Sequence, residues 1–406
     1  MIVAWIAWAC VACALLALGL TLFNTLVWPR GRRDGEPLKR VSVLIPARNE
    51  EDTIEACIRA IARGTHLPME IIVCDDRSTD RTPELLDALQ REVPILTVIQ
   101  GQPLLEGQVG KPRACAQLAQ AARGDVLLFV DADTELTSDG LARISSLFAD
   151  YRADLVTAVP RQVTGSWMER LVLPLLHVTY TSWLPLPLIW WSSDTRFLAA
   201  NGQILGVRAE TYRQVGGFEA VIHEIVDDMA FCRRVKDSGA RVVFADGYAI
   251  AKCRMYRSAQ QVWEGFSKNI YEGLGNRWWA LAMVVALYGL TFIAPWVLAP
   301  VALALGASWW LPATLAWVAN ILMRVTLALR HDHAWLGVAL HPLAVALLLA
   351  IALNSMRWSW RGQVRWRDRV YASRAQRVSG GQPAPHATAE RDTLATQPGW
   401  VGGDGR

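Results

Sequence analysis

The sequence lacks the excess of positive charge that nucleic-acid binding requires. Its net charge is only +4, from 41 Lys and Arg against 37 Asp and Glu, and charged residues make up 19% of the chain. So small an excess does not indicate a nucleic-acid partner. The arginines gather instead beside long uncharged segments, and this distribution favours a membrane surface.

The seven cysteines form no framework. Only Cys10 and Cys13 have the C-x-x-C spacing, and both stand in an uncharged apolar segment. An odd number of cysteines without regular spacing favours free thiols in a reducing compartment. The pattern therefore supports neither a zinc site nor a disulfide scaffold.

Two glycine-rich phosphate motifs are also missing. No G-x-G-x-x-G string follows the first β-branched run, which disfavours a dinucleotide oxidoreductase. No G-x-x-x-x-G-K-[ST] string occurs, so the chain has no P-loop.

Charge is absent altogether from residues 1–29, a length that can cross a hydrocarbon core. The segment has no basic start and no small-residue cleavage site, so we interpret it as a retained transmembrane anchor. Basic residues follow at once and predict that residue 30 onward is cytoplasmic. They are Arg30, Arg32, Arg33, Lys39 and Arg40.

The C-terminal part is also apolar. Residues 278–323 carry no charge and suit two spans that turn near 306–312, and 334–356 is a further candidate, so we predict two or three transmembrane helices over 278–356. Residues 357–406 form a basic juxtamembrane segment and an expected disordered tail. Three C-terminal crossings conflict with the positive-inside rule, because the arginines after residue 356 indicate the cytoplasm. The sequence leaves this conflict open.

Between these regions, residues 30–275 have the pattern of an α/β domain. Apolar β-branched runs alternate with helical stretches at 53–63 and 83–92, which predicts an open, mostly parallel sheet with helices on both faces. The expected strands are 41–45, 70–74, 95–99, 125–130 and 154–159.

One segment inside this domain, 167–191, is unusually apolar. Pro174, Pro185 and Pro187 argue against a straight spanning helix. We expect an interfacial or re-entrant element with tryptophans at head-group level. A buried core segment is the alternative.

Polar residues follow three of the expected strands. They are Pro46, Arg48 and Glu50 after the first strand, Asp75 and Asp76 after the second, and Asp131 and Asp133 after the fourth. Ligands bind outside the carboxyl ends of strands in open α/β sheets. A single Asp there is usually a cap or a turn former, but three acidic strand ends favour a common site. The D-x-D string suits one Mg²⁺ or Mn²⁺ completed by substrate phosphates.

Two further features belong to this chemistry. Lys111 precedes an expected helix, and its ammonium suits a diphosphate. Asp227 and Asp228 open another helix, where they act either as caps or, with one pKa raised by the other, as a general base.

Taken together, the strings PARNEE, CDDRSTD, GK, DAD and VDDMAFCRR resemble family 2 glycosyltransferases of the GT-A fold over about residues 40–275. VGKPRA, NGQILGVRAETYRQVGGFEA and CRMYRSAQQVWEGFSKN look like the branch that glycosylates carotenoid-type isoprenoid acids, with hopanoid-associated relatives further off.

The resemblance implies roles for individual residues. Asp75 and Asp76 contact the base and ribose, Asp131 and Asp133 bind the sugar nucleotide and a metal with Asp133 as the direct ligand, and Lys111 lies near the diphosphate. Asp228 is the base, Asp227 replaces the family's usual Glu, and Gln108 stands where the branch often has Trp. Gly202 and Gln203 line the acceptor side, with Trp263 and Lys268 near the family's Q-x-x-R-W position.

That Q-x-x-R-W string is missing here, which favours transfer of a single sugar. The resemblance therefore implies an inverting, non-processive enzyme in the inner membrane with a cytoplasmic catalytic domain. Its expected donor is a nucleotide-diphosphate sugar, most commonly a UDP-sugar in this family, and its expected acceptor is a lipid or isoprenoid. The alternatives are a processive polysaccharide synthase, a nucleotidyltransferase and a non-catalytic nucleotide-sugar-binding membrane protein.

Overall fold

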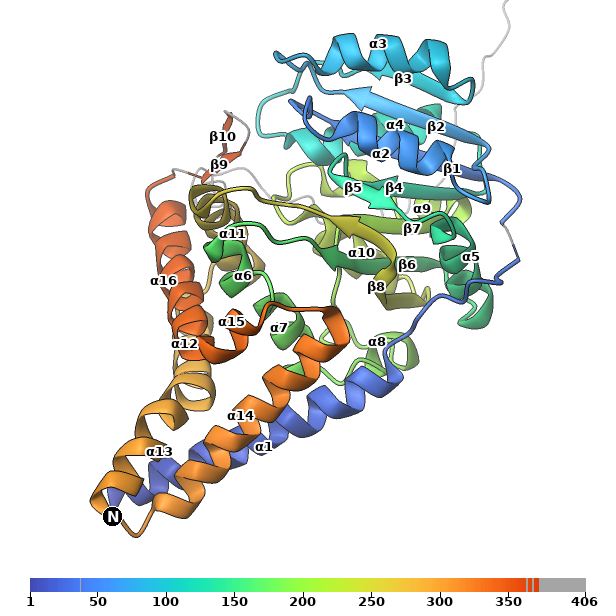
Figure 1. Ribbon diagram of the computed structural model, residues 1–406. Helices are drawn as coiled ribbons and strands as arrows, with labels where there is room; N and C mark the ends of the chain where they lie inside the picture. The colour runs from blue at the N-terminus through green and yellow to red at the C-terminus, as the bar shows by residue number, and fades with distance from the viewer. Residues whose placement is uncertain (37, 363, 367–368, 372–406) are drawn as a thin grey trace, which may run out of the picture.

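The computed structural model describes residues 1–362, 364–366 and 369–371, with residue 37 left out. Within these residues, a sheet-based domain sits at one end of a group of long apolar helices (Figure 1). The expected disordered tail and part of the arginine-rich run before it lie outside the described residues.

The five apolar runs of the sequence all form strands; four of them are largely buried in the sheet, and β3, at its edge, is only partly buried. They are β1 Val41–Ala47, β2 Glu70–Asp75, β3 Leu96–Gln100, β4 Val126–Val130 and β6 Leu155–Gln162. The two expected helices are α2 Ile54–Ala62 and α3 Thr82–Glu92. Three strands were not among the expected ones: β5 Thr134–Leu136, β7 Ile204–Arg208 and β8 Val242–Cys253.

The strands form one sheet in the order β3-β2-β1-β4-β7-β6-β8-β5. The pairs β2/β3, β1/β2, β1/β4 and β6/β8 are parallel, whereas β7 and β5 pair antiparallel with their neighbours. The mostly parallel α/β class is therefore confirmed. Because β2, β1 and β4 are parallel neighbours, their carboxyl ends share one edge.

Helices cover both faces of this sheet (Figure 1), and an apolar cluster fills each side. The remaining elements of the domain are α4 Gly110–Ala121, α5 Gly140–Asp150, α9 Ala209–Gln214, η1 Phe218–Val221, α10 Asp227–Asp237 and α11 Ala259–Gly273.

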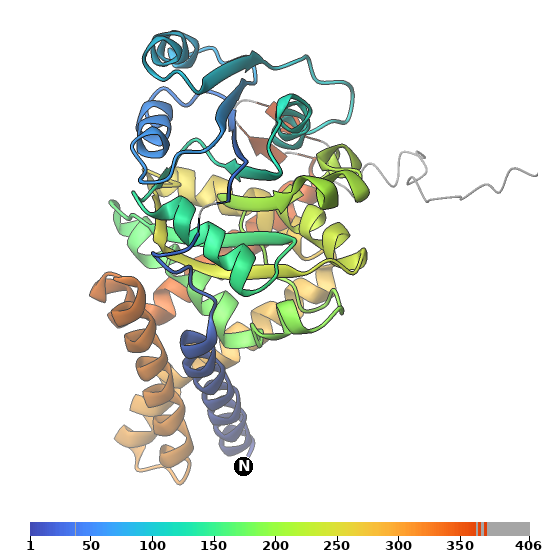
Figure 2. The same ribbon diagram turned by 90° about the vertical axis from the view of Figure 1, so that its right-hand side faces the viewer.

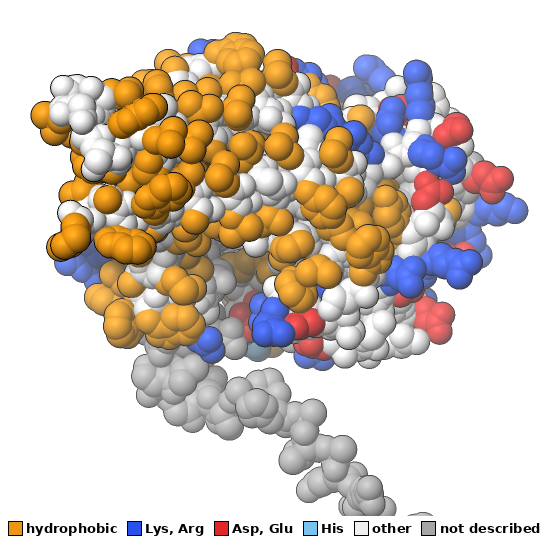
Figure 3. Space-filling view, turned by 90° about the horizontal axis from the view of Figure 1, so that it is seen from below, with side chains coloured by type: hydrophobic (Ala, Val, Ile, Leu, Met, Phe, Trp, Pro, Cys, Tyr) orange, Lys and Arg blue, Asp and Glu red, His pale blue; other side chains and the backbone are white. Residues whose placement is uncertain are grey.

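In the part of the chain that the structure describes, four helical stretches are long and apolar enough to cross a membrane. They are α1 Ile2–Val27, the continuous run of α12 Trp278–Tyr288, η2 Gly289–Ile293 and α13 Ala294–Leu305, then α14 Trp310–His331, and α16 His341–Trp360. Figure 2 shows α1 and the C-terminal helices projecting from the same end of the domain. Seen from that end, apolar side chains cover most of the surface and charged ones lie toward one edge (Figure 3).

The expected third C-terminal span, 334–356, is divided into a short α15 Trp335–Ala339 and α16. The ring of His341, at the start of α16, lies 5.4 Å from that of Phe292, and Ser359 donates to the Asn276 side chain at 3.0 Å. Helix α16 therefore runs beside α12 and η2 and does not accompany α13, as Figure 1 also shows. The small sheet of β9 Val364–Trp366 and β10 Arg369–Tyr371 follows it.

The proline-rich segment breaks into α6 Trp167–Val172, α7 Leu175–Trp183 and α8 Leu188–Trp191. Helix α7 packs against α1, where the Asn24 amide donates to the carbonyls of Thr181 and Leu184 at 2.8 Å. Most of α7 is buried, whereas Trp191 is 74% exposed. An interfacial position for this segment stays a prediction.

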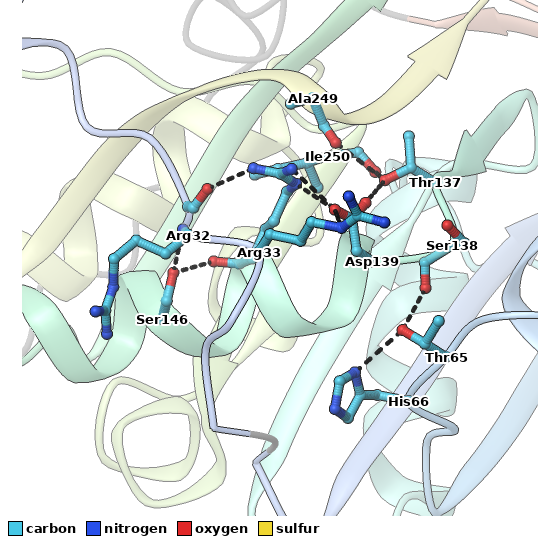
Figure 4. Close-up of polar contacts among 12 residues, drawn as sticks. Arg32, Arg33, Thr65, His66, Thr137, Ser138, Asp139, Ser146, Ala249 and Ile250 are labelled. Carbon is cyan, nitrogen blue, oxygen red and sulfur yellow. Dashed lines mark hydrogen bonds and ion pairs between the residues drawn. The ribbon is translucent and has the colours of Figure 1, made fainter.

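The basic residues that follow α1 pair with acids of the domain. Arg30 contacts Asp246 at 3.3 Å and Arg32 contacts Asp150 at 3.0 Å. Arg33 contacts Asp139 at 3.4 Å, within the polar network drawn in Figure 4. The Arg32–Asp150 pair is exposed and therefore weak, whereas Asp246 is buried. Together with Trp28, which is 3% exposed and packed on β8, these pairs fix how α1 meets the domain.

Candidate active site

The ends of β1 and β2 form one side of the site. The Asp76 amide donates to the Ala47 carbonyl at 2.8 Å, and the Arg48 guanidinium donates to the Asp76 carbonyl at 2.6 Å. Asp75 and Asp76 are 2% and 5% exposed. A Cβ on Gly101, after β3, would lie 2.9 Å from the Asp76 Cα, so glycine allows these two loops to approach closely.

Pro46 and Glu50, two of the expected donor-binding residues, lie in different structural positions. Pro46 lies within β1, beside Cys74 of β2. The Glu50 carboxylate accepts from the Thr53 hydroxyl at 2.8 Å, and the Glu50 amide donates to the Thr82 hydroxyl at 2.8 Å. Glu50 thus braces the starts of α2 and α3.

The D-x-D turn after β4 faces Lys111 at the start of α4. Lys111 Nζ and Asp131 Oδ1 are 2.6 Å apart. Burial opposes the charge of Lys111, but Asp131 and Asp227 outweigh it and hold its pKa above the ordinary value. Burial, and then the neighbouring Asp131, raise the pKa of Asp133. The neighbouring positive charge is thus too small to balance both the Asp131 and the Asp133 carboxylates.

The start of α10 reaches the same place. Asp227 is 8% exposed, and burial raises its pKa to about 6 against the pull of Lys111, with Asp228 raising it further. A Cβ on Gly202 would lie 3.2 Å from Lys111 Nζ and 3.4 Å from the Asp228 Cβ. Three segments far apart in the sequence therefore converge on Lys111.

The expected acceptor-side residues divide into two groups. Gln203 lies directly behind the D-x-D turn, since its carbonyl accepts from the Asp131 amide at 3.1 Å. Burial lowers the pKa of Lys268, on α11, to about 8, while Asp227 opposes that shift. Trp263 is not brought to the acids; it packs in the apolar cluster that α6 and the C-terminal helices share.

Sequence reasoning missed several residues at this site. Tyr180 of α7 lies near Asp228, and burial followed by this carboxylate raises its pKa. Asp133 also lines a pocket of about 180 Å³ together with Lys252, Arg254 and Arg257. Tyr180 belongs to a segment whose composition indicates a membrane surface, so the sequence offers no signal for it. Arg254 and Arg257 lie in the string CRMYRSAQQVWEGFSKN, but the resemblance assigns them no role.

These donors fit one divalent cation. Asp131 and Asp133 present two partly buried carboxylates at one turn. Across the described residues, no group of three or more His, Cys, Asp or Glu is arranged to hold a metal. Mg²⁺ and Mn²⁺ commonly take one or two carboxylates and complete their shell with substrate phosphates, so this incomplete set suits them.

Comparison with known proteins agrees with this geometry. Residues 42–197 match the family described as glycosyl transferase family 2. The mannosyltransferase PcManGT from Pyrobaculum calidifontis, solved in complex with GDP-Man and Mn²⁺, superimposes with a TM-score of 0.54 at 20% identity, covering 87% of this chain and 98% of that one. Residues 42–197 are thus similar to a family 2 glycosyltransferase domain, and the fold is that of the GT-A enzymes; together with the named relatives, these similarities support a glycosyltransferase.

Two curated relatives bear the same enzyme name. The 4,4'-diaponeurosporenoate glycosyltransferase of Staphylococcus haemolyticus is 26% identical over 263 residues, covering 63% of this chain and 68% of the relative. The Staphylococcus aureus (strain USA300) protein of the same name is 24% identical over 375 residues, covering 88% of this chain and 95% of the relative.

Proposed function

We propose that this enzyme transfers one sugar, with inversion, from a nucleotide-diphosphate sugar to a lipid or isoprenoid acceptor at the membrane. The observation that carries the proposal is the convergence of Asp131, Lys111 and the Asp227–Asp228 pair at one sheet edge, on a domain that sits on apolar helices. We propose a UDP-sugar as donor. A GDP-sugar is the second donor to test, because the mannosyltransferase relative was solved with GDP-Man.

The donor lies along the carboxyl ends of β2, β1 and β4. Asp75 and Asp76 contact the base and ribose, in the narrow edge that Gly101 leaves open. Lys111 exchanges part of its contact with Asp131 for the diphosphate. Asp133 and Asp131 would hold a divalent cation, which would supply positive charge to the leaving diphosphate, where electrostatic stabilisation contributes most to the rate.

Asp228 acts as the general base. It is the less buried of the two acids, and it lies beside Gly202. Asp227 lies deeper, between Lys111 and Lys268, and tunes the charge around its neighbour. The acceptor oxygen attacks the anomeric carbon while the nucleoside diphosphate leaves from the opposite face. An ionised acid acceptor needs less help from the base than a hydroxyl.

An isoprenoid acid is the acceptor class that we propose to test first. The relatives' printed name supports it. The absence of a Q-x-x-R-W string argues against long products, and a polymer in the assay below would favour the processive alternative.

The proposed topology has three crossings: α1, residues 278–305 and α14. Helix α16 lies beside α12 and α11 at the end nearer the domain. It then stays on the cytoplasmic side with the domain, and so do Arg357 in its last turn and Arg361 directly after it. The conflict with the positive-inside rule disappears. A reporter fused after residue 362 should be cytoplasmic; a reporter on the opposite side would contradict this topology.

The enzyme test uses the purified chain with a panel of labelled nucleotide sugars and a lipid extract. We expect one nucleotide sugar to label one lipid class with a single sugar, as measured by mass spectrometry. Asp133→Asn should abolish the labelling. Binding of the nucleotide sugar without any labelled lipid or polymer would overturn the proposal in favour of a non-catalytic protein.

A further inference from the structure

Helix α16 has an exposed face that is apolar over most of its length. Leucines and alanines recur there at the three- and four-residue spacing of one helical face, and Leu343 and Leu353 are 47% and 48% exposed. We refer to this set as the outer face of α16; it consists of Leu343, Ala346, Ala350 and Leu353. The preceding α15 continues the face, because Trp335 and Leu336 are exposed as well.

The opposite face of α16 is bonded to α11 by polar side chains. The Asn354 amide donates to the Ser267 hydroxyl at 3.0 Å, and the Tyr271 amide donates to the Ser355 hydroxyl at 2.9 Å. The charged residues of α11 are Glu264, Lys268 and Glu272. A helix with so many charges does not lie in hydrocarbon. Helix α16, which packs along it, therefore does not cross a bilayer core on its own, although its length and composition would allow a crossing.

Water is a poor environment for the outer face of α16. Soluble surfaces rarely expose a continuous row of large apolar side chains unless something covers it. A helix with one face packed and the other exposed and apolar is typical of the membrane interface. The chain also reaches this face directly from α14, which is long and apolar enough to span, with only residues 332–334 between α14 and α15. This continuity favours lipid as the covering partner.

Tryptophans and arginines gather at the C-terminal end of α16. Trp360 is exposed there, and the bond from Ser359 to the Asn276 side chain brings this end beside the start of α12. Trp278 and Trp279, at that start, are exposed too. The exposed arginines at the same level are Arg277, Arg357 and Arg361. Exposed tryptophans beside basic residues are typical of the head-group layer on the cytoplasmic side.

The N-terminal end of α16 lies nearer the domain than the far ends of the spanning helices. Arg324 donates to the Gly337 carbonyl at 3.4 Å, so α15 lies beside the last two turns of α14. Residues 310–323 of α14 extend beyond this contact by roughly 20 Å of helix. Since a bilayer core is about 30 Å thick, most of the core lies beyond α15. Helix α16 thus reaches into one leaflet only.

We propose that α15 and the outer face of α16 bind phospholipids of the cytoplasmic leaflet without crossing it. The leucines contact acyl chains close to the head groups, and Trp360 with the neighbouring arginines lies among the head groups. Helix α11 is bonded to α16 and carries Lys268, which interacts with Asp227, so the lipid contact holds one side of the catalytic site at a fixed height. This contact requires the membrane insertion proposed above, but neither the sugar nor the acceptor.

The test measures the depth of a fluorescent label on the full chain in phosphatidylcholine vesicles. Cys13→Ser is the parent chain, because Cys13 alone among the seven cysteines, which all lie in described segments, is not buried. An environment-sensitive fluorophore is attached at Leu343→Cys or Leu353→Cys. The vesicles contain a lipid with a nitroxide either near the head group or near the end of the acyl chain. We expect blue-shifted emission at both positions and stronger quenching by the nitroxide near the head group.

Two other leucines calibrate the depth. Leu315→Cys, on α14, is 44% exposed and should be quenched most by the nitroxide near the chain end. Leu67→Cys, in the domain loop before β2, is 62% exposed and should be quenched by neither lipid.

Labels on α16 that behave like the Leu67 label would overturn the proposal, because the outer face would then lie in water or against another protein. Stronger quenching of the α16 labels by the chain-end nitroxide would overturn it too, since α16 would then cross the bilayer. An unquenched Leu315 label would show that the chain is not inserted, and the proposed topology would fail as well. Quenching at Leu315 without quenching on α16 would refute the lipid contact alone.

Discussion

The stability of the unliganded enzyme should depend on the charge of Asp227. This carboxyl is 8% exposed, and burial raises its pKa from 3.8 to about 6. This rise in pKa corresponds to a free-energy cost of about 3 kcal/mol for ionising Asp227 in the folded state. The stability that the neutral form contributes is fully present below about pH 4 and is lost as the pH rises through 6. An amide keeps the neutral form at every pH.

We therefore expect Asp227→Asn to be more stable than the wild type at pH 8, by up to about 3 kcal/mol, and equally stable near pH 4. Thermal unfolding without donor or metal measures this; an increase of about 5 °C at pH 8 is the order expected for a chain of this size. Asp237→Asn, an exposed acid on the same helix, is the control and should show no such pH dependence. A variant less stable than the wild type at pH 8 would refute the reasoning.

Three further outcomes follow from the site. Asp228→Asn should lower kcat about 10²–10⁴-fold with a hydroxyl acceptor and leave donor binding intact; turnover near the wild-type rate would reject Asp228 as the base. Excess EDTA should stop transfer and added Mn²⁺ restore it, whereas full activity in EDTA would remove the cation from the mechanism. Gly202→Ala would bring a Cβ to 3.2 Å from Lys111 Nζ and should therefore raise the donor KM about tenfold. Gly273→Ala places its Cβ in open space and should leave the donor KM unchanged. Equal KM values for the two variants would show that Gly202 does not border the donor.

The sequence revealed the parallel part of the sheet because buried parallel strands are continuous apolar runs. Asp75, Asp131 and Asp227 could be singled out from the sequence because each ends a strand, directly follows one or begins a helix. Strand β7 was missed, since Ile204–Arg208 contains Gly206 and pairs antiparallel inside the sheet. No local pattern marks such an insertion.

Other features depend on three-dimensional packing alone. Hydropathy does not distinguish α16, which lies along α11, from a helix that accompanies α13. Tyr180 lies in an apolar segment, and only the fold brings it toward Asp228. His177 and His331 are far apart in the sequence yet stack at 4.0 Å. Composition and residue spacing do not predict contacts of this kind.

The most direct test of the proposed mechanism is a structure of the full chain with a nucleotide sugar and Mn²⁺ bound. We predict one donor molecule along the sheet edge, with its base at Asp76, its diphosphate at Lys111, the Mn²⁺ at Asp133 and the anomeric carbon facing Asp228. A nucleotide bound elsewhere, or a sugar turned away from Asp228, would contradict the account.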